Sequence, residues 1–285
     1  MTFHSTHTLQ IGAVALAVAD LELMADFYRG VLGLNPLGQG SGQVTLGAGD
    51  TPLVRLIAQP GGQRYPAAPG LYHFAILLPD RPSLARILYQ LAERGYPLQG
   101  ASDHGVSEAL YLADPEGNGI ELYRDRPAAE WPRDEQGNLE MVTDALNLDR
   151  LILELKGKVE PWRGIAAQTV MGHVHLQVSD VAAARAFYTS IIGLEHQQDY
   201  GNQASFLSAG GYHHHVGINS WHSRGSAPRP EDGLGLRYFE LVLPEVGMAA
   251  DMRQRAEQAS LAVEQQDGGL LVRDPSQNGV MVRAG

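Results

Sequence analysis

Apolar residues alternate with polar or small residues in two stretches that lie far apart in the chain. Residues 11–19 read IGAVALAVA and residues 171–178 read MGHVHLQV, and such alternation is typical of a half-buried strand. Each stretch leads to an aspartate, Asp20 or Asp180, placed where the N-cap of a helix belongs. A helical stretch follows in both cases, and we expect Gly33 and Gly193 to end it.

These two stretches belong to an internal repeat with an offset of 160 residues. Residues 11–35 and 171–195 are identical at nine of 25 positions, including a Phe-Tyr pair and a Gly-Leu pair. A second pair of segments is also alike, GLYHFAILLP at 70–79 and GLRYFELVLP at 235–244. Helices are expected after these strands, and both halves end on an Asp-Pro-x-x-Asn-Gly run that favours a hairpin.

The repeats divide the chain into four units, near residues 9–60, 70–125, 169–222 and 233–284. Each unit reads as a strand, a helix and two or three strands, which predicts an α+β fold of four βαβββ modules. We therefore expect an N-terminal domain over 9–125 and a C-terminal domain over 169–284. The stretch 126–168 fits no unit, and it is interpreted as a connector with one helix.

The amino-acid composition argues against several classes of function. With 44% hydrophobic and 19% charged residues the chain has a globular composition, and its net charge of −11 lacks the basic footprint of proteins that bind nucleic acid or anionic membranes. There is no cysteine, which excludes disulfides, thiolate metal sites and a cysteine nucleophile. The N-terminal residues carry no signal-peptide pattern and no apolar run reaches a membrane span, so a cytoplasmic location is expected.

Four βαβββ units in two pairs resemble the vicinal oxygen chelate superfamily. Units one and three also open on the order typical of it: a strand, Asp, a helix with Phe-Tyr, and Leu-Gly-Leu or the close variant Ile-Gly-Leu. The resemblance covers nearly the whole chain except the connector. It implies that pairs of modules form two open barrels and that metal ligands come from the first strands and from a last strand. Because glyoxalases, fosfomycin-resistance enzymes, bleomycin-binding proteins and extradiol dioxygenases share this fold, the site decides the function.

The resemblance implies one ligand position on the first strand of each unit, held here by Ala13, His73, His173 and Tyr238. On the last strand of units two and four, the implied ligand positions are held by Glu121 and Met281. Pairing modules that are neighbours in sequence leaves each barrel short of a ligand. Pairing module 2 with module 3 instead unites His73, Glu121 and His173, and it leaves modules 1 and 4 as a vestigial barrel. Two imidazoles and one carboxylate leave positions open on one face of an ion, which suits non-haem Fe(II); Mn(II) fits the same ligands.

Residues 102–121, SDHGVSEALYLADPEGNGIE, resemble a local pattern of extradiol ring-cleaving dioxygenases. The pattern places a histidine, a tyrosine and a metal-binding glutamate at the positions of His104, Tyr111 and Glu121. Ser102 departs from the residues usual at the first position, which precedes the functional histidine. The resemblance implies that His104 and Tyr111 hydrogen-bond a substrate oxygen.

The same family carries a functional histidine in a His-His pair on the last strand of the partner module. Here module 3 supplies GGYHHHVGINSW at 210–221, and matching the His-His pair of the family to this run assigns the role to His214. A shift of one residue in this match would assign it to His213 or His215 instead. His214 is then the acid–base group that takes and returns a substrate proton. His175 shares the strand face of His173, and it is interpreted as a packing or supporting residue.

The leading hypothesis is an Fe(II)-dependent extradiol dioxygenase similar to catechol 2,3-dioxygenases, acting on a small aromatic diol and dioxygen in the catabolism of aromatic hydrocarbons. One alternative is a glyoxalase-like isomerase or lyase, which would not need His104, Tyr111 and His214 together. Another is a ligand-sequestering protein without enzymatic activity, against which the metal triad argues. No nucleic acid or membrane partner is expected, and the sequence leaves a homo-oligomer open.

Overall fold

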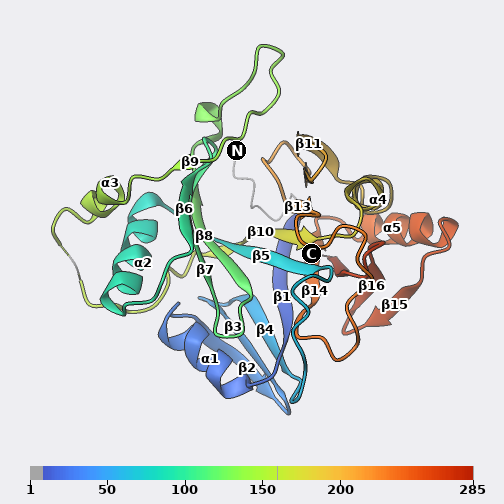
Figure 1. Cartoon of the computed structure of the whole chain (residues 1–285), viewed down its shortest axis with the longest axis horizontal. Coiled ribbons are helices and arrows are strands. Elements are labelled where there is room, and N and C mark those ends of the chain that lie inside the picture. Colours follow the sequence, from blue (N-terminus) through green and yellow to red (C-terminus); the bar gives the residue numbers. More distant parts are fainter. Residues whose placement is uncertain (1–8, 159, 285) are drawn as a thin grey trace. The chain divides into compact units, whose positions relative to one another are not determined.

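The computed structural model describes residues 9–158 and 160–284, and within this range the chain forms four βαβββ modules (Figure 1). Module 1 consists of β1 (Gln10–Val18), α1 (Leu21–Gly30), β2 (Asn35–Gly40), β3 (Gln43–Ala48) and β4 (Thr51–Ala58). Module 2 consists of β5 (Gly70–Leu77), α2 (Arg81–Glu93), β6 (Gly100–Asp103), β7 (Ser107–Ala113) and β8 (Gly119–Asp125). The predicted βαβββ order is therefore confirmed in the first half of the chain.

The second half repeats this order after a connector. Module 3 consists of β10 (Val170–Gln177), α4 (Val181–Phe187), the π-helical turn η3 (Tyr188–Ile192), β11 (Glu195–Tyr200), β12 (Ala204–Ser208) and β13 (Val216–Asn219). Module 4 consists of β14 (Gly235–Leu243), α5 (Val246–Gln258), β15 (Val263–Gln266), β16 (Gly269–Arg273) and β17 (Gly279–Ala284). The connector holds η1 (Ala128–Glu130), β9 (Asp144–Ala145), α3 (Leu148–Ile152) and η2 (Leu153–Leu155).

The strand orders confirm that modules 1 and 4 share one sheet and modules 2 and 3 the other. The first sheet has the order β15-β16-β17-β14-β1-β4-β3-β2, and the second has the order β11-β12-β13-β10-β5-β8-β7-β6-β9. Within the first sheet β1 runs antiparallel to β14, from Gln10 opposite Val242 to Ala17 opposite Gly235. Inside the modules, first and last strands run parallel, as in β5 with β8 and β10 with β13, which the intervening helix makes feasible.

Contacts divide the chain into two compact units that cut across its sequence halves. One unit comprises the residues up to Ala17, residues 61–72 and the residues from Gly172 on, and the other comprises residues 18–60 and 73–171. This division places β1 with the C-terminal modules, so it groups the chain differently from the expected domains. The domain boundaries at 125 and 169 stay a prediction.

Side-chain caps explain why the helices begin where they do. Asp20 accepts a hydrogen bond from the backbone N–H of Leu23 and Asp180 accepts one from Ala183, each over 3.0 Å, as the sequence predicts. α4 continues into the π-helical turn η3, and Gly193 is the C-cap of this turn with a φ of 95°, so the helical stretch ends at Gly193 as expected. The first helix instead ends at Gly30, so the prediction that Gly33 ends it is wrong: Gly33 adopts its positive φ of 73° in the following turn.

The Asp-Pro-x-x-Asn-Gly runs form the hairpins between the last two strands of modules 2 and 4. Asp114 accepts hydrogen bonds from the backbone of Glu116 and from both nitrogens of Asn118, over 2.8–3.1 Å. Asp274 makes the same bonds to Ser276 and Asn278 over 2.8–3.0 Å. The two aspartates therefore fix the turns that return β8 and β17 beside their first strands.

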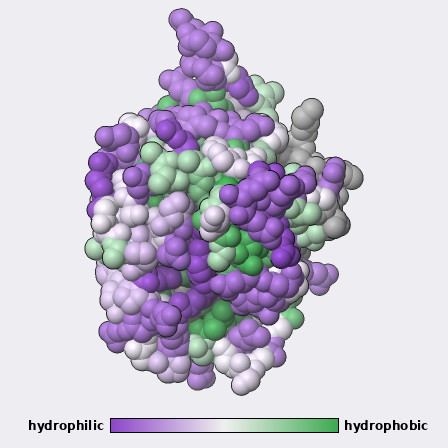
Figure 2. Space-filling view, turned by 90° about the vertical axis from the view of Figure 1, so that its right-hand side faces the viewer, coloured by the Kyte–Doolittle hydropathy of each residue, from purple (hydrophilic) through white to green (hydrophobic). Residues whose placement is uncertain are grey.

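Large apolar side chains are concentrated in the interiors of the two units. The exceptions on the described surface include Leu153 and Tyr200, with 72% and 64% of their surface exposed. The face drawn in Figure 2 is mostly hydrophilic, with small apolar patches between polar side chains. None of the described helices is both long and apolar enough to cross a bilayer.

Candidate metal and catalytic site

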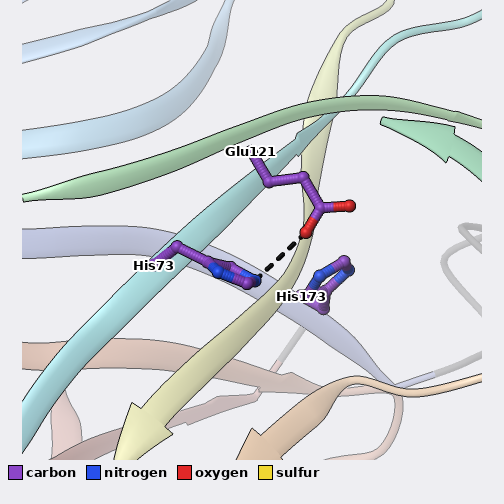
Figure 3. Close-up of side chains that lie close together, drawn as sticks. All are labelled: His73, Glu121 and His173. Carbon is purple, nitrogen blue, oxygen red and sulfur yellow. Dashed lines mark ion pairs between the residues drawn. The ribbon is translucent and has the colours of Figure 1, made fainter. Parts of the chain in front are cut away.

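His73 and Glu121 lie side by side because β5 and β8 are parallel neighbours. In their register His73 is opposite Gly119 and Ala75 is opposite Glu121, so both side chains project from the same face of the sheet. The Nε2 atom of His73 is 3.1 Å from Oε2 of Glu121 (Figure 3). Only 8% of His73 and 2% of Glu121 is exposed. A carboxylate buried to this degree requires a positive partner, and a divalent cation is one that an imidazole can share with it.

The third expected ligand, His173, comes from β10 and is 2% exposed. One ligand atom from each of His73, Glu121 and His173 lies within 4.8 Å of the other two (Figure 3). Among the described residues these form the one group of three or more His, Asp or Glu side chains with such spacing. The donor set of two nitrogens and one oxygen fits non-haem Fe(II) or Mn(II), and it makes this cluster a candidate metal site.

His104 and Tyr111 form a hydrogen-bonded pair at the β6–β7 hairpin. The Nε2 atom of His104 is 2.7 Å from the hydroxyl of Tyr111, and its Nδ1 atom is 2.7 Å from the carbonyl oxygen of Val142. A carbonyl can only accept, so Nδ1 carries a proton, and in the neutral ring Nε2 accepts the proton of the Tyr111 hydroxyl. Both ring nitrogens of His104 are therefore engaged, and its effect on a substrate passes through Tyr111.

Tyr111 in turn connects this pair to the candidate ligands. Its ring centroid lies 5.7 Å from that of His73, and Tyr111 is opposite Glu121 in the β7–β8 ladder. The connector supplies the carbonyl of Val142, which the sequence could not indicate because every residue carries a backbone carbonyl. The connector is thus part of the site's support.

The His triplet lies ahead of the last strand of module 3. β13 begins at Val216, so His214 occupies the segment before it, and the expectation that it lies on the strand is wrong. Gly210 and Gly211 both have positive φ values, 65° and 76°, and this turn directs the triplet inward before strand pairing starts.

Of the three histidines, His214 is the one whose ring lies against His173. Their centroids are 4.0 Å apart, whereas His213 lies 6.1 Å from His173. His213 and His214 share a hydrogen bond between their Nδ1 atoms over 2.8 Å, and the ring of Phe206 contacts His214 edge-on at 5.0 Å. This contact orients His214, and 9% of its surface remains accessible.

His215 has a different, structural environment. Its Nδ1 atom lies 2.9 Å from the hydroxyl of Ser208 and accepts from the backbone N–H of Ala209 at 3.3 Å. Only 1% of the residue is exposed. His215 therefore anchors the turn to β12, which leaves His214 as the better placed histidine.

The corresponding positions of modules 1 and 4 are held by Ala13, Tyr238 and Met281, all buried. The nearby carboxylate of Glu240 is neutralised by Arg283, whose Nε lies 2.9 Å from Oε1, and its other oxygen accepts from the backbone N–H of Ala13 at 3.3 Å. In this sheet the buried acid is thus satisfied by a guanidinium and a backbone donor.

Comparison with known proteins agrees with the fold and the composition of the site. The sequence matches the Glyoxalase/Bleomycin resistance protein/Dioxygenase superfamily over residues 10–122 and again over 170–282. Since the two matches cover most of the chain, the protein belongs to this superfamily.

Individual relatives narrow the comparison. Catechol-2,3-dioxygenase of Bacillus subtilis (strain 168) is 41% identical over 269 residues, which is 93% of this chain and 93% of the relative. Biphenyl-2,3-diol 1,2-dioxygenase 3 of Rhodococcus globerulus is 31% identical over 50% of this chain and 77% of its own length. The crystal structure of glyoxalase I from Zea mays superposes with a TM-score of 0.60 over 96% of this chain and 92% of its own, at 15% identity, which supports the fold alone.

Proposed function

We propose that this protein is an extradiol dioxygenase that opens the ring of a catechol-type aromatic diol with dioxygen, using Fe(II) bound by His73, Glu121 and His173. The observation that carries the proposal is the spacing of these three buried side chains, with their ligand atoms within 4.8 Å of one another. The near full-length similarity to a catechol-2,3-dioxygenase supports the reaction class. When bound, the metal would supply a Lewis acid that acidifies the diol hydroxyls, with open positions for two vicinal oxygens and dioxygen.

In this proposal His214 moves the proton. Its ring lies beside His173 and is oriented by His213 and Phe206, so it faces a substrate held next to the ligands. A base placed in this way removes a hydroxyl proton from the diol and later returns it to the ring-opened product. The 9% exposure of His214 limits the water that competes for the same proton.

Tyr111 and His104 hold the substrate oxygen. The Tyr111 hydroxyl donates a hydrogen bond to Nε2 of His104. The lone pairs of its oxygen can then accept a hydrogen bond from a protonated diol oxygen. The Val142 carbonyl keeps the His104 ring in the orientation that this hydrogen bond needs.

The aromatic side chains of module 3 suit a planar substrate. Phe206 packs edge-on against both His214, at 5.0 Å, and His175, at 5.7 Å. Trp221 continues this group, with its ring 5.5 Å from that of His175. Aromatic walls of this kind bind a benzene ring through edge-to-face contacts.

The test is to load the metal-free protein anaerobically with Fe(II) or Mn(II) and to measure oxygen uptake with a panel of catechols. We expect one oxygen consumed for each diol, a yellow ring-opened product, and activity that depends on Fe(II). Absence of oxygen uptake by protein containing one Fe(II) per chain would contradict the proposal. Conversion of a hemithioacetal without oxygen would favour a glyoxalase-like reaction instead.

A further inference from the structure

A polar cavity lies on module 2, and none of the candidate metal ligands lines it. Its volume is about 560 Å³, and it is lined by residues 145–147 of the connector and by Arg81, Asp103, Glu108, Arg124, Arg126 and Arg150. Glu108 and Tyr111 are three residues apart on β7, as are Glu121 and Arg124 on β8, so members of each pair project from opposite faces of the sheet. The cavity therefore lies on the face of the sheet against which α2 packs, and α3 packs against α2 (Figure 1).

Glu108 is the buried floor of this cavity and has three guanidinium neighbours. Its Oε2 atom accepts from Nε of Arg81 and from Nε of Arg124, each at 2.8 Å. Its Oε1 atom lies 3.5 Å from Nη2 of Arg126, which is 2.6 Å from Asp103. With 4% of Glu108 exposed, this one carboxylate organises the arginines into a fixed array.

The cavity carries more positive than negative charge. Four arginines line it against two carboxylates, and Glu154 pairs with Arg81 from outside the lining. This local excess contrasts with a chain whose net charge is −11. Arg150 is exposed, and in the described part of the chain its side chain has no carboxylate partner.

We propose that this cavity is a binding site for a small oxyanion, a carboxylate or phosphate group, held by Arg126 and Arg150. Guanidinium groups bind such anions through paired, charge-assisted hydrogen bonds, and Arg126, held by Asp103 and Glu108, loses little conformational entropy on binding. Because Arg150 belongs to α3 and Arg126 follows β8, the anion would fasten the connector to the sheet. The inference does not depend on the proposed dioxygenase activity, because Glu108 and Arg124 of the cavity project from the sheet face opposite to Tyr111 and Glu121.

The experiment is calorimetric titration of the full chain with inorganic phosphate, and separately with citrate, in a buffer of constant ionic strength set with chloride. Arg150→Gln is the main variant, since its side chain takes part in no ion pair of the described array. Arg253→Gln, an exposed arginine of α5 paired with Glu257, is the control with the same change in charge. We expect saturable binding by the wild type and the control, and an affinity at least about 10-fold weaker in Arg150→Gln.

Titration with the two anions shows whether the cavity binds a phosphate group or a carboxylate group. Saturable binding of phosphate alone assigns a phosphate group, and binding of citrate alone assigns a carboxylate. Absence of binding for both anions, or equal binding by Arg150→Gln and wild type, would overturn the proposal. Thermal melting of Arg150→Gln provides the check that the variant is folded when it is titrated.

Discussion

The hydroxyl of Tyr28 donates a hydrogen bond to Oδ2 of Asp114 over 2.8 Å, inside the protein and across 86 residues of sequence. Tyr188 and Asp274 repeat this bond over 3.3 Å with the same separation. In each pair the tyrosine comes from the helix of one module and the aspartate from the hairpin of the next. These bonds join modules that are consecutive in sequence, whereas the sheets join modules 1 with 4 and 2 with 3.

Burial raises the pKa of both aspartates, and it raises the pKa of Asp274 to about 6. The folded protein therefore favours the protonated form of Asp274 relative to the unfolded chain. The resulting stabilisation is fully present below about pH 4, the usual range of the unfolded carboxyl, and is lost as pH rises through 6. Relative to Asp274→Asn, the wild type should lose about 2 kcal/mol of unfolding free energy between pH 4 and pH 7. Urea unfolding of both proteins across this range measures the difference.

Asp134 provides a control of opposite sign. It closes an exposed turn with the same bonds, to Gln136 and Asn138, and the hydrogen bond from the Asn138 side chain holds its pKa below the ordinary value. Its contribution to stability is present above the ordinary pKa and is lost as pH falls. The difference between wild type and Asp134→Asn should therefore shrink on acidification. A pH-independent difference for Asp274→Asn would contradict the assignment.

Glu121→Gln should lose iron with the fold intact, because the amide cannot neutralise a cation beside two imidazoles. Glu240→Gln is the matched control, since Glu240 is also a buried strand carboxylate but is paired with Arg283. Metal content per chain after Fe(II) loading and gel filtration is the measurement. Equal iron in Glu121→Gln and wild type would exclude Glu121 as a ligand.

His214→Phe should keep its iron and lower turnover by roughly 10²–10⁴-fold, the usual contribution of general acid–base catalysis. His196→Phe, an exposed histidine of the same module, should leave turnover unchanged. The comparison requires kcat together with iron content. If His214→Phe lost its iron, His214 would be a ligand, and if it kept full turnover, the base would lie elsewhere.

Tyr111→Phe should act more mildly and reduce kcat/KM by about 2- to 10-fold, because it removes one neutral hydrogen bond and leaves the proton carrier in place. In Tyr238→Phe the same hydroxyl is removed from the other sheet, and no change in kcat/KM is expected. A loss of activity in Tyr111→Phe as large as that in His214→Phe would show that the hydroxyl itself transfers the proton.

The fold was predictable from the sequence because its signals are local and occur twice. Asp20 and Asp180 cap their helices, and the Asp-Pro hairpins appear where the repeats place them. The pairing of modules 2 and 3 was predictable because it is the pairing that completes a set of metal ligands, and the strand orders confirm it.

Other features could not be predicted, because they depend on tertiary contacts without a sequence signal. The carbonyl of Val142 holds His104, and no property of a valine side chain indicates this. The position of His214 before β13 depends on where strand pairing begins. The arginine array around Glu108 combines β7, β8, α2 and the connector, segments that no repeat relates. The individual roles of the site residues remain predictions for the variants described above.

The pairing of β1 with β14 has a consequence for synthesis on the ribosome. β1 is translated before β14, and its partner residues, Gly235 to Val242, follow about 220 residues later. At 5–20 residues per second this delay is roughly 10–45 s. During that time the newly made apolar strand has its own β4 on one side and an open edge on the other. Nascent chains of this protein should therefore be clients of ribosome-associated chaperones until module 4 has been translated.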